Sequence, residues 1–265
     1  MIVDRAAAVL AEHGVETART DAEWIVAHVA GVSRSELAFA DVRDDAAVWP
    51  LVARRANREP LAYVLGEWGF RRLVLRCDER ALVPRPETEA LVERALSICR
   101  RIHPHAVLDV GTGSGAIALA LADETDAEVV AMDASEDALE LARENAARLG
   151  LTVRFVHGDL RDGLPPGPFD VVVSNPPYVL PDEIDHLEPE VRDWEPREAL
   201  VDEGQTEAIV REAVQVLRPG GVLLLEIHEK RGKEISALFE ETGYEGIRIV
   251  RDLAGKERLV EGRRV

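Results

Sequence analysis

The chain has 265 residues, of which 46% are hydrophobic and 31% charged, a composition typical of a globular protein with ample core. It contains no apolar run as long as a membrane span and begins without a signal-peptide pattern, so we expect a cytoplasmic protein with no membrane partner. The formal net charge of −18 argues against nucleic acid as the main partner, because phosphate contacts dominate such binding. Its only cysteines, Cys77 and Cys99, are too few for a zinc cluster, and we expect no metal site.

The first 60 residues are predicted to form a small helical bundle. Apolar residues recur at helical spacing over residues 2–10. Capping-box patterns that begin at Thr20 and Ser33 predict two further helix starts. A last helix is expected over residues 46–56.

The next segment, residues 61–83, changes its period. It alternates weakly and is interrupted by Gly66 and Gly69, which predicts a hairpin-like linker. Pro86 then suits the first position of a helix over residues 87–99, because proline is already fixed at a helical φ.

From residue 105 onwards, strand and helix patterns alternate, which predicts a mainly parallel sheet covered on both faces. Strands are expected at residues 106–110, 127–132, 152–157, 169–174 and 221–227, and helices at residues 115–123, 135–149, 204–217 and 231–242. Two last strands, near residues 244–251 and 257–262, are joined too closely for a parallel crossover and must form an antiparallel hairpin. Residues 84–265 are therefore predicted to be one Rossmann-like α/β domain with a seven-stranded sheet. This domain carries nearly all the negative charge, since residues 1–83 hold 11 arginines against 13 acids.

The stretch "DVGTGSG" between the first strand of this domain and its helix is a candidate ligand loop. It contains Asp109, Gly111, Thr112, Gly113, Ser114 and Gly115. Its glycines let the backbone approach a ligand closely, and the following helix N-terminus favours a negative group. Taken alone, such a loop can also be a tight turn without a ligand.

Acidic residues end the next two strands. Asp133 follows the second strand, where its carboxylate can accept from both hydroxyls of a ribose. Asp159 follows the third strand, where it can accept from an adenine amino group with Leu160 beside the ring. Because the carboxyl ends of parallel strands line one crevice, these residues and the glycine loop predict a nucleoside site.

The fourth strand runs directly into Asn175-Pro176-Pro177-Tyr178. The two prolines remove backbone donors and fix two φ angles, so this turn is rigid. The Asn175 side-chain oxygen and the Pro176 carbonyl can accept two hydrogen bonds from one planar NH₂ group, while Tyr178 stacks on its flat face. Such contacts orient a weak nitrogen nucleophile towards an electrophile, without a metal or a general base.

The pairing of "DVGTGSG" with "SNPPY" resembles class I S-adenosylmethionine-dependent methyltransferases that act on planar amino or amide nitrogens. Four further stretches, at residues 58–70, 82–93, 195–200 and 251–260, are similar to the HemK/PrmC family of protein-(glutamine-N5) methyltransferases. That family modifies the glutamine of the Gly-Gly-Gln motif in class I peptide-chain release factors. The resemblance covers nearly the whole chain and is weakest in residues 1–57.

The resemblance implies methyl transfer from S-adenosyl-L-methionine to the glutamine side-chain nitrogen, leaving S-adenosyl-L-homocysteine. It implies that cofactor is bound by Asp109, Gly111, Thr112, Gly113, Ser114, Gly115, Asp133, Asp159, Leu160 and Asn175. It implies that Asn175, Pro176 and Tyr178 are catalytic and that they and Pro177 hold the glutamine. Leu160 departs from the aromatic residue that can occupy this place in the family.

Other segments take supporting roles under this interpretation. Residues 179–203 would form a substrate-binding loop, and Phe70, Arg85 and Glu87 would shape the site. The helical bundle, with Arg54, Arg55 and Arg58, is expected to dock a domain of the release factor. We expect a monomer.

Several alternatives stay open from the sequence. An adenine-N6 nucleic-acid methyltransferase shares the Asn-Pro-Pro-Tyr chemistry, but it needs phosphate-neutralising surface around the crevice, and this half of the chain is acidic. A glutamine in a ribosomal protein is another possible acceptor. A nicotinamide dehydrogenase would need a second mononucleotide-binding half. A catalytically idle scaffold for a translation factor is the remaining alternative.

Overall fold

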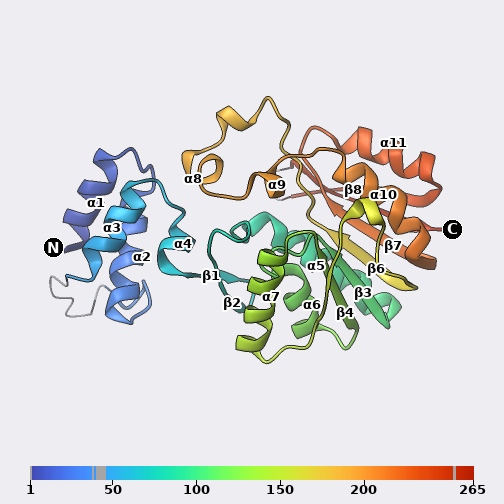
Figure 1. The fold of residues 1–265 in the computed structure, drawn as a ribbon, viewed down its shortest axis with the longest axis horizontal. Coiled ribbons are helices and arrows are strands. Elements are labelled where there is room, and N and C mark those ends of the chain that lie inside the picture. Colours follow the sequence, from blue (N-terminus) through green and yellow to red (C-terminus); the bar gives the residue numbers. More distant parts are fainter. Residues whose placement is uncertain (1, 38, 40–45, 253–254) are drawn as a thin grey trace.

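A computed structural model of the chain describes residues 2–37, 39, 46–252 and 255–265. The N-terminal helices are α1 (Ile2–Glu12), α2 (Ala18–Ala30), α3 (Val48–Ala56) and α4 (Leu61–Leu65). The first three share a core that includes Leu10, Ile25 and Val52, and α4 adds Val64 to it. The predicted bundle is therefore confirmed, and it extends past residue 60. It stands beside the sheet domain at one end of the molecule (Figure 1).

The two predicted capping boxes had different outcomes. The one at Thr20 is wrong, because α2 already begins at Ala18 and Thr20 lies inside the helix. At Ser33 the reciprocal bonds are present: the Ser33 N–H donates to Glu36 Oε2 at 2.9 Å, and the Glu36 N–H donates to Ser33 Oγ at 3.3 Å. They close a turn over residues 34–37 rather than a helix, and the chain from residue 38 to residue 45 lies almost entirely outside the described residues.

The hairpin predicted in the linker is confirmed. Strands β1 (Glu67–Phe70) and β2 (Leu73–Arg76) pair antiparallel, and helix α5 (Pro86–Ile102) begins at the predicted proline. The buried Asn145 ties this hairpin to the glycine loop, because its side-chain nitrogen donates to the carbonyls of Arg76 and Ser114.

The main sheet has seven strands in the order β5-β4-β3-β6-β7-β9-β8. They are β3 (Ala106–Val110), β4 (Glu128–Asp133), β5 (Arg154–His157), β6 (Phe169–Ser174), β7 (Leu217–Glu226), β8 (Tyr244–Arg251) and β9 (Glu257–Arg264). Strands β3 to β7 are parallel, and β9 runs antiparallel to both β7 and β8. This is the predicted sheet. The central strand β6 is buried along its whole length, as expected for a parallel strand covered on both faces.

Helices cover both faces of the sheet. The covering helices after α5 are α6 (Ala116–Glu124), α7 (Glu136–Leu149), α10 (Gln205–Val216) and α11 (Gly232–Thr242). Along β6, Val171 and Val173 pack in the core shared with α5 and α6, whereas Val172 packs in the core shared with α10 and α11. This alternation follows from the two-residue period of a strand.

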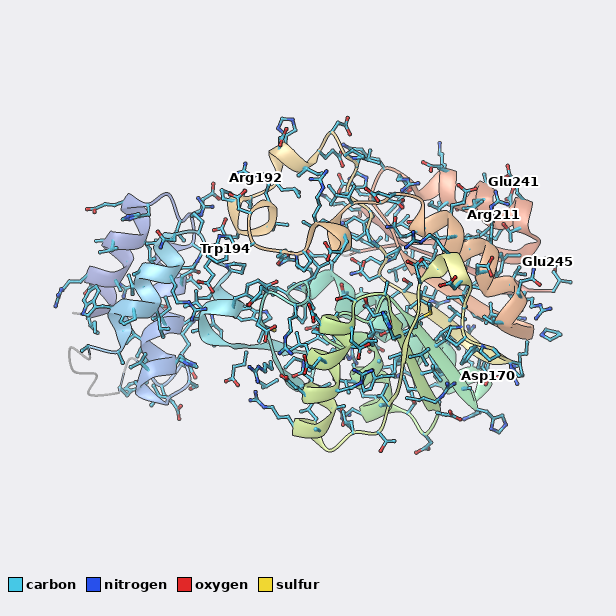
Figure 2. The ribbon with its side chains drawn as sticks, viewed as in Figure 1. Asp170, Arg192, Trp194, Arg211, Glu241 and Glu245 are labelled. Carbon is cyan, nitrogen blue, oxygen red and sulfur yellow. The ribbon has the colours of Figure 1, made fainter. Side chains whose placement is uncertain are left out.

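The long connection at residues 179–203 forms short helical turns, including α8 (Pro189–Arg192) and α9 (Arg197–Leu200). A parallel bridge between Val179 and Val201 closes it. The segment with α8 reaches towards the helical bundle (Figure 1), and Trp194 lies on that side of the sheet domain (Figure 2). Trp194 packs against a small buried cluster that contains Tyr63. Within the described residues, no helix is long and apolar enough to cross a membrane.

Candidate active site

The carboxyl ends of the central strands lie level with one another. Val110 of β3 pairs with Met132 of β4 and with Ser174 of β6. Ser174 in turn pairs with Leu225 of β7. The residues that come after these positions therefore meet at one edge of the sheet, on either side of β3, where the strand order reverses. Such a reversal is where ligands bind in open α/β sheets.

The glycine loop leaves open space for a ligand beside Gly111. The φ angles of Gly111, Gly113 and Gly115 are 73°, 54° and 85°, a region that side chains disfavour. An added Cβ at Gly111 would meet no atom within 4 Å, whereas one at Gly115 would lie 3.0 Å from Leu119 Cδ1. Gly111 thus borders an opening, whereas a side chain at Gly115 would crowd Leu119 of α6 and Ala142 of α7.

Asp109 is fully buried below this loop, with 0% of its surface exposed. Its Oδ2 accepts from the Thr112 hydroxyl at 2.7 Å and from the Ala118 N–H at 3.2 Å. Its Oδ1 accepts no hydrogen bond from any described residue. Burial raises the pKa of Asp109 to about 7. The loop therefore carries a buried acceptor with unused capacity.

Asp133 supports the loop from the end of β4. Its two oxygens accept from the N–H groups of Gly113 (2.8 Å) and Ser135 (2.9 Å). Burial raises its pKa, although those backbone bonds oppose the change. Each carboxylate oxygen can accept a second bond, so the predicted contacts with ribose hydroxyls are compatible with this geometry.

Asp159 is engaged differently from Asp133. Its carboxylate accepts from Arg161 Nε at 3.0 Å and Nη2 at 2.6 Å, which contributes to lowering its pKa to about 2. A bond from an adenine amino group would have to share this carboxylate, so that role stays a prediction. Leu160 is half-buried and packs against the apolar core on the α10 side of the sheet.

The Asn175 side chain presents a free acceptor at the end of β6. Its Nδ2 donates to Thr88 Oγ1 at 3.0 Å, while its Oδ1 is buried and accepts nothing from the described residues. Tyr178 donates from its hydroxyl to Glu226 Oε1 at 3.4 Å. Neither Thr88 nor Glu226 was predicted from the sequence. The available signal for Glu226 was a carboxylate ending the apolar run "VLLLE", as Asp133 ends "VVAMD".

The three residues expected to shape the site lie in different environments. Phe70 is buried in the core beneath α5 and α6. Arg85 donates through Nη2 to both oxygens of the buried Glu195, at 2.7 and 2.6 Å, and so ties the start of α5 to the 179–203 segment. Burial raises the pKa of Glu226 to about 7, and the charge of Glu87 contributes in the same direction.

Comparisons with known proteins agree with this arrangement. Residues 104–255 match the family described as methyltransferase domain, and residues 2–66 match the PrmC N-terminal domain. The chain is 42% identical to the release factor glutamine methyltransferase of Deinococcus radiodurans, over 99% of this chain and 97% of that one. It is 39% identical to the enzyme of that name from Caulobacter vibrioides, over 96% and 92% of the two chains.

Solved structures show the same fold at lower identity. A methyltransferase from Pyrococcus furiosus superposes with a TM-score of 0.52 at 21% identity, over 72% of this chain and 88% of that one. A 16S rRNA methyltransferase of T. thermophilus, solved with AdoMet and guanosine, has a TM-score of 0.53 at 21% identity, over 75% and 50% of the chains.

The fold and the family matches define a class I S-adenosylmethionine-dependent methyltransferase, as the sequence predicted. Within that class, the chain belongs to the release factor glutamine methyltransferase family.

The residues at the crevice fit the cofactor of this class. S-adenosylmethionine carries an ammonium group, two ribose hydroxyls and an adenine amino group, all of which donate hydrogen bonds. Asp109 Oδ1 and Asn175 Oδ1 are buried acceptors without partners among the described residues, and Gly111 borders open space. Which acceptors at the crevice contact the cofactor is a proposal, and the first test is made at the carboxylate of Asp133, which ends β4.

Replacement of Asp133 by alanine is expected to weaken S-adenosylmethionine binding by at least about tenfold. Hydrogen bonds to a charged group contribute about 1.5–3 kcal/mol each, and the variant also loses the support of the Gly113 N–H. Isothermal calorimetry measures the change, with the exposed Asp137→Ala as the matched control. Unchanged affinity in Asp133→Ala would remove this carboxylate from the cofactor site.

Proposed function

We propose that this protein transfers a methyl group from S-adenosylmethionine to the side-chain amide nitrogen of the glutamine in the Gly-Gly-Gln motif of class I release factors. Membership of the release factor glutamine methyltransferase family supports the reaction and the substrate. The observation that carries the chemistry is the unpartnered Oδ1 of Asn175 at the crevice, which accepts from no described residue. A planar NH₂ group is the donor that this acceptor lacks.

The chain's own residues would orient the glutamine. Asn175 Oδ1 and the Pro176 carbonyl each accept one N–H of the substrate amide, and Pro177 keeps the turn rigid. Tyr178 stacks on the amide plane, with its hydroxyl held by Glu226. When bound, S-adenosylmethionine supplies an electrophilic methyl group. Orientation and electrostatic preorganisation of the nitrogen then provide the rate enhancement, since an amide nitrogen is intrinsically a poor nucleophile.

The helical bundle is proposed to dock a domain of the release factor. Of the three arginines expected there, Arg54 is exposed and pairs with Glu59, whereas Arg55 and Arg58 face the 179–203 segment. Arg55 is only 5% exposed and donates to Asp21 and to Glu190 of α8. Arg58 also donates to Glu190, at 2.6 Å. These two arginines hold the bundle against the 179–203 segment instead of facing a partner.

The surface that remains available includes an aromatic pair where the bundle meets the hairpin. Trp24 of α2 is 37% exposed. The centroid of its ring system lies 5.8 Å from that of Trp68 in β1. Aromatic side chains of this kind are enriched at protein interfaces. We place the docking surface there, and the boundary of the bundle after Gly66, because α4 packs within the bundle core.

An adenine-N6 nucleic-acid methyltransferase would need unpaired cations near the crevice. The chain's three lysines, Lys230, Lys233 and Lys256, line one hollow with Arg251, yet Glu229 and Glu257 line it too. Lys256 pairs with Glu229 at 2.7 Å, and Arg251 pairs with Glu257 at 2.5 Å. Two of the four cations that line this hollow are therefore paired within it, and the experiment on DNA below tests this alternative. A monomeric state and a cytoplasmic location stay predictions.

Mass spectrometry of candidate substrates tests the proposed function. Purified release factors, a ribosomal protein fraction and adenine-containing DNA are incubated separately with the enzyme and S-adenosylmethionine. The expected result is one methyl group on the Gly-Gly-Gln glutamine of a release factor. Methylated DNA or a methylated ribosomal protein, with release factors unchanged, would replace the proposed substrate.

A further inference from the structure

Methylation of an amide nitrogen releases a proton that some group must receive. As the new N–C bond forms and the C–S bond breaks, the positive charge passes from sulfur to the substrate nitrogen, which then gives up one hydrogen. The oxygens proposed to hold that nitrogen, on Asn175 and Pro176, belong to amide carbonyls, which are very weak bases. A carboxylate binds a proton far more tightly. A carboxylate beside Asn175 would therefore be the natural acceptor.

Glu226, the last residue of β7, is the neighbour of Asn175 in the sheet. Ser174 of β6 pairs with Leu225 of β7, so the next residues of these two parallel strands, Asn175 and Glu226, stand side by side at the carboxyl edge. The residues two positions earlier on each strand pack in the core shared with α5. Because side chains alternate along a strand, Asn175 and Glu226 point to that same side.

The carboxyl group of Glu226 has one oxygen engaged and one free. Its Oε1 accepts from the Tyr178 hydroxyl at 3.4 Å. Its Oε2 is buried and accepts from no described residue, as is also true of Asn175 Oδ1. Glu226 is 1% exposed, and a buried acceptor left without a donor costs free energy. Two such acceptors on neighbouring side chains indicate one ligand that carries hydrogen-bond donors.

We propose that Glu226 is a catalytic residue whose free oxygen, Oε2, receives the proton that the substrate nitrogen loses on methylation. This inference rests on the proposed function. The nitrogen lone pair forms the N–C bond, and the sulfur keeps the electron pair of the broken C–S bond. The hydrogen directed at Asn175 is shared with Glu226 and moves to it as a proton, leaving its bonding pair on nitrogen. Until then, the carboxylate stabilises the positive charge that develops on nitrogen. The neutral carboxyl group later returns the proton to solvent.

The groups around Glu226 determine the pH range in which it can accept a proton. Burial raises its pKa to about 7, and the charge of Glu87 on α5 contributes in the same direction. Arg258 on β9 and the Tyr178 hydroxyl oppose that rise. A carboxyl group accepts a proton only when it is ionised, which requires a pH above its pKa. The rate of methyl transfer should therefore fall as the pH drops below about 7.

The titration of Glu226 reports its contact with the substrate without any turnover. In the full-length enzyme labelled with ¹³C at the glutamate carboxyl groups, the Glu226 resonance is the one that Glu226→Gln lacks, and its midpoint should lie near about pH 7. In the complex with S-adenosylhomocysteine and the methyl acceptor, the midpoint should fall by about one pH unit or more, because a hydrogen bond donated to a carboxylate favours its ionised form. An unchanged midpoint in that complex would place Glu226 out of reach of the substrate and overturn the proposal.

Single-turnover rates at saturating substrate test the chemical role. The wild-type rate should rise with pH up to about pH 7 and be constant above it. Glu226→Gln should remove that rise and lower the constant rate by about 10²-fold, the lower end of what a positioned proton acceptor contributes. Glu226→Asp, which keeps a carboxylate, should recover part of the rate and the rise with it. A rise that persists in Glu226→Gln would belong to another group, such as Asp109 with its pKa of about 7, and would overturn the proposal.

Glu261→Gln is the matched control, because Glu261 is also a buried carboxylate but pairs with Arg94 away from the crevice. It should keep the wild-type rate and the wild-type rise with pH. Methylation of DNA or of a ribosomal protein in place of a release factor would contradict the proposed function alone, since those nitrogens also lose a proton and both Glu226 tests then use that acceptor. A release factor methylated at the wild-type rate by Glu226→Gln would contradict this inference alone.

Discussion

Asn175→Ala is expected to lower the rate of methyl transfer by about 10²–10³-fold in a chain that remains folded, the range found when one preorganised contact is removed from an active site. The lost carbonyl is the buried acceptor that lacks a partner among the described residues. Without it, the substrate nitrogen loses one of its two carbonyl acceptors and its orientation is no longer defined. The effect should appear in kcat at saturating substrate, measured by quantifying methylated release factor over time.

Two comparisons separate this mechanism from general damage to the site. Asn57→Ala changes an asparagine at the end of α3, outside the crevice, and should leave turnover unchanged. Tyr178→Ala should be milder than Asn175→Ala, and Tyr178→Phe milder still, because the phenylalanine ring keeps the stacking contact. Near wild-type turnover in Asn175→Ala would mean that its carbonyl does not orient the nucleophile.

The sheet could be predicted from the sequence because each central strand is an apolar run with a turn at its end. Strands β3 and β6 occupy the predicted residues 106–110 and 169–174. Hydrophobic periodicity predicted the helices less accurately where the chain is polar. The Thr20 pattern imitates a helix start inside α2, and the short helix α4 was not predicted because five residues are too few to show a helical period.

The site residues, too, fall into those that the sequence could place and those that it could not. Residues directly after a strand could be placed at the crevice, since the parallel topology brings strand ends together. Thr88 could not, because it comes from α5 and reaches Asn175 only through tertiary packing, across 87 positions of sequence. Conversely, Arg55 and Arg58 were predicted to belong to a docking surface because of their charge, and this prediction was wrong. Only the fold reveals that Glu190 already pairs with them.

Removal of residues 1–66 is expected to lower kcat/KM for an intact release factor by about 10²-fold or more, a loss of about 2.7 kcal/mol of interaction. A Gly-Gly-Gln tip offers little contact area, whereas stable protein complexes bury about 1,600 Å² in total. Most of the affinity must therefore come from a second surface, which we assign to the bundle. A short Gly-Gly-Gln peptide should lose much less. Both substrates are measured with the same truncated enzyme, and calorimetry of cofactor binding checks that its sheet domain is intact.

The truncated chain also loses the contacts of the bundle with Glu190, and Tyr63 no longer packs against Trp194, so the 179–203 segment could change for a second reason. Arg58→Ala separates the two effects, because it breaks one of those contacts and leaves the bundle core in place. If docking is the function of the bundle, Arg58→Ala should retain most of the activity on intact release factor. If instead the bundle only holds the 179–203 segment, Arg58→Ala should slow peptide and protein alike, and the truncated enzyme should lose equally on both substrates. That second pattern would contradict docking by the bundle.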